Sequence, residues 1–80
     1  MNIREKFYDI MEKEDDFSVL KNEVKAMLDE AKLSGKILDY EMNSDIDVYD
    51  SPGMDIYYLS IAWVNNDGEL NIAGTSYYSC

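Results

Sequence analysis

The stretch that decides the fold runs from residue 38 to residue 48 and reads Leu38-Asp39-Tyr40-Glu41-Met42-Asn43-Ser44-Asp45-Ile46-Asp47-Val48. Its residues alternate in character. One parity carries the apolar side chains (Leu38, Tyr40, Met42, Ile46, Val48), and the other is polar and acidic (Asp39, Glu41, Asn43, Asp45, Asp47). Successive side chains of a strand point to opposite faces. The stretch therefore predicts a strand with one apolar face and one carboxylate face.

Charge is distributed unevenly along the chain. The net charge is −10, and no Lys or Arg follows Lys36. Eight carboxylates do follow it (Asp39, Glu41, Asp45, Asp47, Asp50, Asp55, Asp67, Glu69). Such acidity opposes binding to nucleic acid or to an anionic membrane, because like charges repel. It favours a basic protein partner.

Two helices are predicted before this strand. Ile3, Phe7, Ile10 and Met11 recur on one face of a helix over residues 2–14. A second helix over residues 17–33 has its own apolar stripe (Leu20, Val24, Met27, Leu28, Ala31). Asp15 or Asp16 can cap it, and Gly35 can end it. One unbroken helix through residues 12–16 is the alternative.

Three strands are predicted after the helices, over residues 37–49, 55–64 and 69–78. Residues 50–53 (Asp-Ser-Pro-Gly) and 65–68 (Asn-Asn-Asp-Gly) are turn sequences. A four-residue loop at 65–68 pairs Trp63 with Leu70 and Ile61 with Ile72. The first hairpin pairs Val48 with Asp55, Ile46 with Tyr57, Met42 with Ile61 and Tyr40 with Trp63.

These elements predict one α+β domain over residues 1–80, with two N-terminal helices packed on one face of a three-stranded antiparallel meander. The face under the helices is expected to be apolar (Leu38, Tyr40, Met42, Ile46, Val48, Tyr57, Leu59, Ile61, Trp63, Leu70, Ile72). The other face has no predicted element to cover it. It is expected to carry the acids of the first strand, Ile56, Tyr58, Ser60, Ala62 and Val64 from the second, and Asn71, Ala73, Thr75 and Tyr77 from the third.

Composition fits a small globular protein in a reducing compartment. Hydrophobic residues make up 46% of the chain, which argues against general disorder. The single cysteine, Cys80, cannot form a disulfide framework within the chain. Residues 2–6 are typical of a mixed helix rather than a signal peptide, and no apolar run approaches the ~20 residues that span a membrane. We expect a cytoplasmic protein, in the host cytoplasm if it is encoded by a phage.

Catalytic and cofactor signatures are absent from the sequence. The chain has no histidine, which removes the usual general base and imidazole metal ligation. Asn43, Asp45 and Asp47 are spaced like the start of a calcium loop, but Val48 stands where glycine is needed and Met54 where the bidentate acid belongs. We therefore expect no enzymatic activity, no cofactor and no metal.

The carboxylate row has two interpretations. Charges on an edge strand discourage edge-to-edge aggregation. A row of acids about 6.6–7 Å apart can also present negative charge to Arg and Lys side chains arranged for a nucleic-acid backbone. Tyr58 and Tyr77, expected on the same uncovered face, suit binding because tyrosine gives a large contact area at low entropic cost. The predicted partner-binding residues are Asp39, Glu41, Asp45, Asp47, Tyr58 and Tyr77.

In size, acidity, lack of histidine and the charge row at Asp39, Glu41, Asp45 and Asp47, the chain resembles the small phage-encoded inhibitors of bacterial defence, which include anti-CRISPR proteins and DNA mimics. The resemblance lies in composition and not in a family motif. It implies binding to a basic effector or nuclease at its nucleic-acid surface. Bacterial toxin-immunity proteins are similar in kind and are the alternative, followed by a regulatory protein-binding module.

Overall fold

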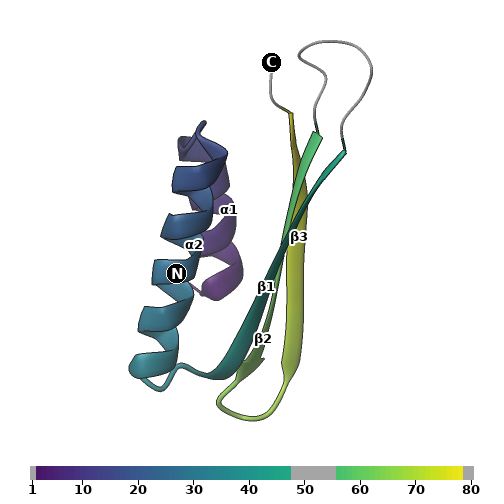
Figure 1. Ribbon diagram of the computed structural model, residues 1–80. Coiled ribbons are helices and arrows are strands. Elements are labelled where there is room, and N and C mark those ends of the chain that lie inside the picture. Colours follow the sequence, from purple (N-terminus) through teal and green to yellow (C-terminus); the bar gives the residue numbers. More distant parts are fainter. Residues whose placement is uncertain (1, 48–55, 79–80) are drawn as a thin grey trace.

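The computed structural model describes residues 2–47 and 56–78, with side chains up to residue 75. The element order is α1 (Ile3–Lys13), α2 (Phe17–Leu33), β1 (Ile37–Asp47), β2 (Ile56–Asn65) and β3 (Leu70–Tyr78). The strands form one antiparallel sheet in the order β1-β2-β3. Figure 1 shows both helices on the same side of this sheet. The predicted α+β arrangement is confirmed. The predicted turn at residues 50–53 lies outside the described residues.

Side chains at the helix ends explain why there are two helices. Asn2 caps α1 by accepting the Glu5 N–H (2.8 Å). Asp16 caps α2 by accepting the N–H groups of Ser18 (2.9 Å) and Val19 (3.3 Å), which would otherwise lack partners. The alternative of one unbroken helix is wrong, since the chain leaves the helical conformation at residues 14–16.

The end of α2 sets the start of the sheet. Gly35 adopts a φ of +80°, and the Lys36 N–H donates to the Ala31 carbonyl at 2.9 Å. This is the left-handed helix ending that the sequence predicts. The chain then enters β1 with Ile37, which is buried in the core.

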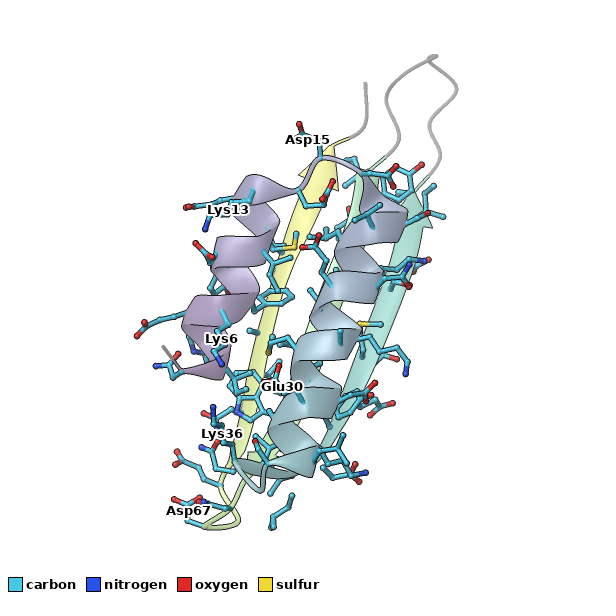
Figure 2. All side chains as sticks on the ribbon, turned by 90° about the vertical axis from the view of Figure 1, so that its left-hand side faces the viewer. Lys6, Lys13, Asp15, Glu30, Lys36 and Asp67 are labelled. Carbon is cyan, nitrogen blue, oxygen red and sulfur yellow. The ribbon has the colours of Figure 1, made fainter. Side chains whose placement is uncertain are left out.

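The core lies between the helices and one face of the sheet. Its buried members come from every element (Ile3, Phe7, Leu20, Val24, Leu28, Ala31, Ile37, Leu59, Ile61, Trp63, Ala73). Seen from the helical side in Figure 2, α1 lies along β3 and α2 along β1. The Tyr8 hydroxyl of α1 donates to the Gly74 carbonyl of β3 (3.3 Å). Trp63 is only 4% exposed, with the Arg4 guanidinium 5.6 Å from its ring centroid.

The first hairpin has the predicted register. Ile46 pairs with Tyr57, Met42 with Ile61 and Tyr40 with Trp63; the pair of Val48 and Asp55 lies outside the described residues. One irregularity falls between Ile37 and Asp39, where an extra residue interrupts the pairing as in a β-bulge. Leu38 is that residue. The prediction that it belongs to the core is wrong, because it is 57% exposed.

The second hairpin differs from the prediction by one residue. Val64 pairs with Leu70, Trp63 with Asn71 and Ile61 with Ala73. The Gly68 N–H donates to the Asn65 carbonyl (2.9 Å), and Gly68 has a φ of +90°. A turn followed by a left-handed glycine is typical of three-residue hairpin loops, so the loop is one residue shorter than predicted.

A shift of one residue exchanges the two faces of a strand. Ala73 is buried under the helices, whereas Leu70 and Ile72 are 62% and 63% exposed. The prediction that Leu70 and Ile72 lie in the core and Asn71, Ala73 and Thr75 on the open face is therefore wrong. Ile46, which the prediction also placed in the core, is 42% exposed near the end of β1.

We predict that Trp63→Ala lowers the free energy of unfolding by about 3–5 kcal/mol, as truncation of a large buried aromatic side chain does. Ile72→Ala should cost less than about 1 kcal/mol, because Ile72 lies on the exposed face. Urea denaturation of both variants measures these values. A large cost at Ile72 with a small cost at Trp63 would show that the facing of the sheet is inverted.

Candidate functional site

The candidate site is the sheet face opposite the helices, which we call the open face. In register order its cross-strand rows are Asp39–Val64–Leu70, Glu41–Ala62–Ile72, Asn43–Ser60–Gly74, then Asp45–Tyr58 and Asp47–Ile56. No described helix or strand covers it (Figure 1). Apolar side chains from β2 and β3 thus lie beside the acids of β1.

Five of the six predicted partner-binding residues share this face. Asp39, Glu41, Asp45 and Asp47 are exposed along β1, and Tyr58 is exposed on β2. The Tyr58 hydroxyl donates to Asp47 Oδ2 (3.0 Å), which ties the aromatic residue to the row. With a rise of about 3.3 Å per residue, the row spans about 27 Å.

Tyr77 is the sixth predicted residue. Its backbone pairs with that of Tyr57, so its position has the parity of Ala73 rather than that of Leu70. Its side chain lies outside the described part of the chain. A role for Tyr77 in binding therefore stays a prediction, without the neighbouring acids that the predicted register gave it.

The row is not uniformly negative, because one cation reaches it from α2. Lys32 Nζ lies 3.2 Å from Asp39 Oδ1. The Tyr40 N–H donates to the same oxygen at 2.9 Å. This backbone hydrogen bond, followed by Lys32, lowers the pKa of Asp39. The charge at this end of the row is partly compensated, whereas the Glu41 carboxylate has no hydrogen bond or ion pair with any described residue.

Two acids of the row also accept hydrogen bonds from backbone N–H groups. Asp45 Oδ1 accepts the Ile46 N–H (2.8 Å), as Asp39 accepts that of Tyr40. β1 is an edge strand of the described sheet, and occupied donors and charge both discourage pairing with another strand. The protective interpretation of the row thus has structural support. It does not explain the apolar side chains beside the row.

A second contact between α2 and β1 holds the row in place. The Tyr40 hydroxyl donates to Asp29 Oδ1, and Lys25 Nζ lies 3.3 Å from Asp29 Oδ2. The Tyr40 hydrogen bond lowers the pKa of Asp29, with a further contribution from Lys25. The same bond raises the pKa of Tyr40. The sequence does not predict these pairs, because their partners lie in elements whose relative placement the hydrophobic pattern leaves open.

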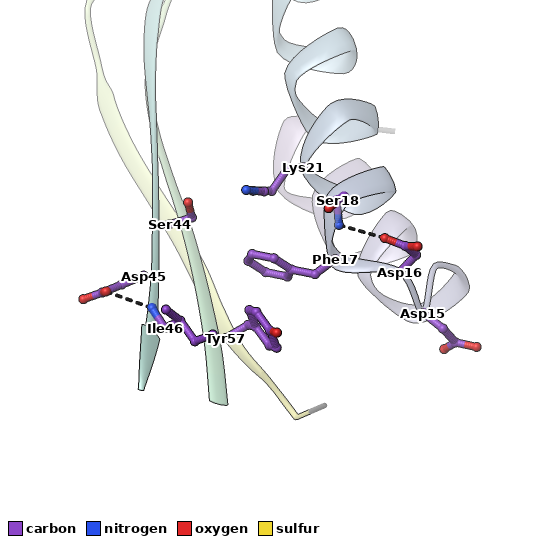
Figure 3. Close-up of a pocket in the computed structure, with 9 residues that line it drawn as sticks. All are labelled: Asp15, Asp16, Phe17, Ser18, Lys21, Ser44, Asp45, Ile46 and Tyr57. Carbon is purple, nitrogen blue, oxygen red and sulfur yellow. Dashed lines mark hydrogen bonds between the residues drawn. The ribbon is translucent and has the colours of Figure 1, made fainter. Parts of the chain in front are cut away.

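Figure 3 shows a cavity of about 570 Å³ on the opposite, helical side of the sheet, where α2 begins. The Phe17 and Tyr57 rings lie 4.6 Å apart at 36°, and Lys21 extends across it towards Ser44. Asp45 points away from Phe17, to the open face. The Asp16 carboxylate on the rim is already engaged as the helix cap. No hydrogen bond joins Lys21 to Ser18 or Ser44 within the described part of the chain, and no pattern in the sequence predicts this cavity.

Among residues 2–47 and 56–78, no group of three or more acidic, cysteine or histidine side chains could hold a metal ion. Within the same residues, no helix is long and apolar enough to cross a membrane.

Comparison with protein-family models, with curated proteins and with solved structures finds no match.

We predict that Tyr40→Phe raises the pKa of Asp29 towards the ordinary aspartate value of about 3.9. The folded protein lowers this pKa, so the stabilisation is present above about pH 4 and is lost as the pH falls through the folded value. The stability difference between wild type and Tyr40→Phe should therefore shrink in acid. Carboxyl NMR titration and urea denaturation measure the two effects.

Tyr58→Phe is the matched control, since its hydroxyl binds Asp47 instead. It should leave the pKa of Asp29 unchanged. An Asp29 titration that is identical in wild type and Tyr40→Phe would contradict the assigned contact.

Proposed function

We propose that this chain is an acidic protein inhibitor of the anti-CRISPR or DNA-mimic type, which binds a basic nucleic-acid-handling protein and blocks its nucleic-acid site. The observation that carries the proposal is the open face, on which exposed acids along β1 lie beside exposed apolar and aromatic side chains. A row that serves solubility alone needs only exposed charge. Solubility does not explain why Leu70, Ile72 and Tyr58 are exposed next to that charge.

The acidic row is complementary in charge to a basic protein surface that binds a phosphate backbone. A protein that binds nucleic acid presents Arg and Lys to regularly spaced phosphates. The acids of β1 form a regular row on a strand that is held to α2 through Tyr40 and Asp39. A preorganised row loses little conformational entropy on binding.

The apolar residues of the open face supply what charge alone does not. Exposed ion pairs contribute less than about 1 kcal/mol each, whereas charge-assisted hydrogen bonds that lose their water contribute about 1.5–3 kcal/mol. Leu70, Ile72 and Tyr58 can exclude water from acids beside them. We therefore assign affinity to the acids that become covered and a faster association rate to the rest.

The first experiment is affinity capture from a bacterial lysate at low and high salt, with identification by mass spectrometry. A basic nucleic-acid-binding effector or nuclease that is released as salt rises, and whose nucleic-acid binding the protein blocks, supports the proposal. A cognate toxin nuclease encoded beside this gene would instead indicate an immunity protein. A partner without a basic surface would contradict both.

We predict that the double substitution Asp45→Lys and Asp47→Lys weakens binding to the captured partner by about 100-fold or more. Both residues are exposed on β1, so the fold should be retained. Binding measured by calorimetry and folding measured by circular dichroism give the two readouts.

The matched control is Glu23→Lys with Glu30→Lys, which changes the net charge equally on the exposed surface of α2; Glu30 is labelled in the view from the helical side (Figure 2). This variant should lose less than about tenfold, through long-range electrostatics alone. Equal losses in the two double variants would show that only net charge matters. Normal binding by the Asp45 and Asp47 variant would leave the row as a solubility device.

A further inference from the structure

One end of the open face contains a depression of about 380 Å³. It lies where β1 and β3 begin and β2 ends, and its lining comes from all three strands (Asp39, Tyr40, Glu41, Ala62, Trp63, Val64, Leu70). Two features set it apart from the rest of the face. It contains Glu41, whose carboxylate bonds to none of the described residues, and it adjoins two highly exposed apolar side chains of the sheet, Leu70 and Ile72.

The cross-strand rows explain why the surface is hollow here. Ala62 lies between Glu41 on β1 and Ile72 on β3. Its single methyl group separates two long side chains, so the middle of the row is low. In the adjacent row, Val64 lies between Asp39 and Leu70. The depression therefore has a carboxylate wall on β1, an apolar wall on β3 and an aliphatic floor on β2.

The two carboxylates of that wall differ in what they can still bind. Lys32 and the Tyr40 N–H both use Asp39 Oδ1, which fixes the direction of this carboxylate. Glu41 keeps both oxygens available, since no described residue bonds to it. A ligand that places positive charge beside Glu41 would complete the hydrogen bonding of the wall.

We propose that this depression receives one arginine side chain of the protein partner. The proposal rests on the function proposed above and adds the chemistry of the contact. The arginine stem packs over Ala62, Val64 and Leu70, as long basic side chains do on apolar surfaces. Its guanidinium donates two hydrogen bonds to Glu41 and reaches Asp39 from the side opposite Lys32.

Arginine fits this site better than other occupants. Its planar fork binds a carboxylate through two bonds, and its weak hydration lowers the cost of leaving water, whereas the lysine ammonium is strongly hydrated. An anionic ligand would face Glu41 with like charge. A second copy docked face to face would oppose one acid row to another, at a net charge of −10 per chain.

The test is an NMR titration of the ¹⁵N-labelled full chain with N-acetyl-arginine amide, with the citrulline analogue as the neutral control of the same shape. We expect saturable shifts at residues 39–41, 62–64 and 70–72, with a dissociation constant on the order of a few millimolar. Citrulline should give none. Glu41→Gln should weaken arginine binding about fivefold or more, and Glu30→Gln, an equal loss of charge on α2, should not change it.

Arginine-specific shifts that are confined to these segments and sensitive to Glu41→Gln support the proposal. Shifts spread over acids of the helices and the sheet alike, equal shifts with citrulline, or identical titrations of wild type and Glu41→Gln would overturn it. The proposed function is judged separately. Suppose that the protein blocks a captured basic partner and that Glu41→Gln binds this partner normally. The arginine site is then ruled out, whereas the proposed inhibitor function stands.

Discussion

Packing of the two helices on one face of the sheet is the constraint on which the rest of this structure depends. The apolar stripes of α1 and α2 meet Leu59, Ile61 and Trp63, whose side chains alternate with those of the open face. Eighty residues provide no third layer among the described elements. Strand side chains that point away from the helices must therefore face water or a partner. That requirement places Asp39 to Asp47 in one exposed row.

The sequence was sufficient for the helices and the first hairpin, because there several signals agree. Asp16 and Gly35 mark the ends of α2, and the alternation of β1 allows one facing only. The second hairpin lacked such agreement. Asn65 to Gly68 fits a loop of three or four residues, and both place glycine at positive φ. Hydrophobicity then favoured burying Leu70 and Ile72.

The packing of α1 on the sheet, and not the hydrophobicity of Leu70 and Ile72, determines the register of the second hairpin. Under α1, whose Tyr8 bonds the Gly74 carbonyl, the sheet presents the small side chain of Ala73 to the core. The bulge at Leu38 is a similar case, since it lets Ile37 reach the core directly after the helix ending. The acids of the candidate site were predictable because strand parity alone exposes them. Their contacts with Lys32 and Tyr58 were not, since these depend on the packing of α2 and on the diagonal between β1 and β2. Leu70 and Ile72, which this packing leaves exposed, make the open face more apolar than the sequence predicts.

Carboxyl labelling of the free chain and of its complex with the captured partner tests the central claim most directly. A carbodiimide with a neutral amine modifies exposed acids, and peptide mass spectrometry reports each site. If the open face is the interface, labelling of Glu41, Asp45 and Asp47 falls sharply in the complex, while Glu23 and Glu30 on α2 are labelled as before. Protection of the two helical acids with an unchanged β1 row would contradict the account and move the interface to the helical side.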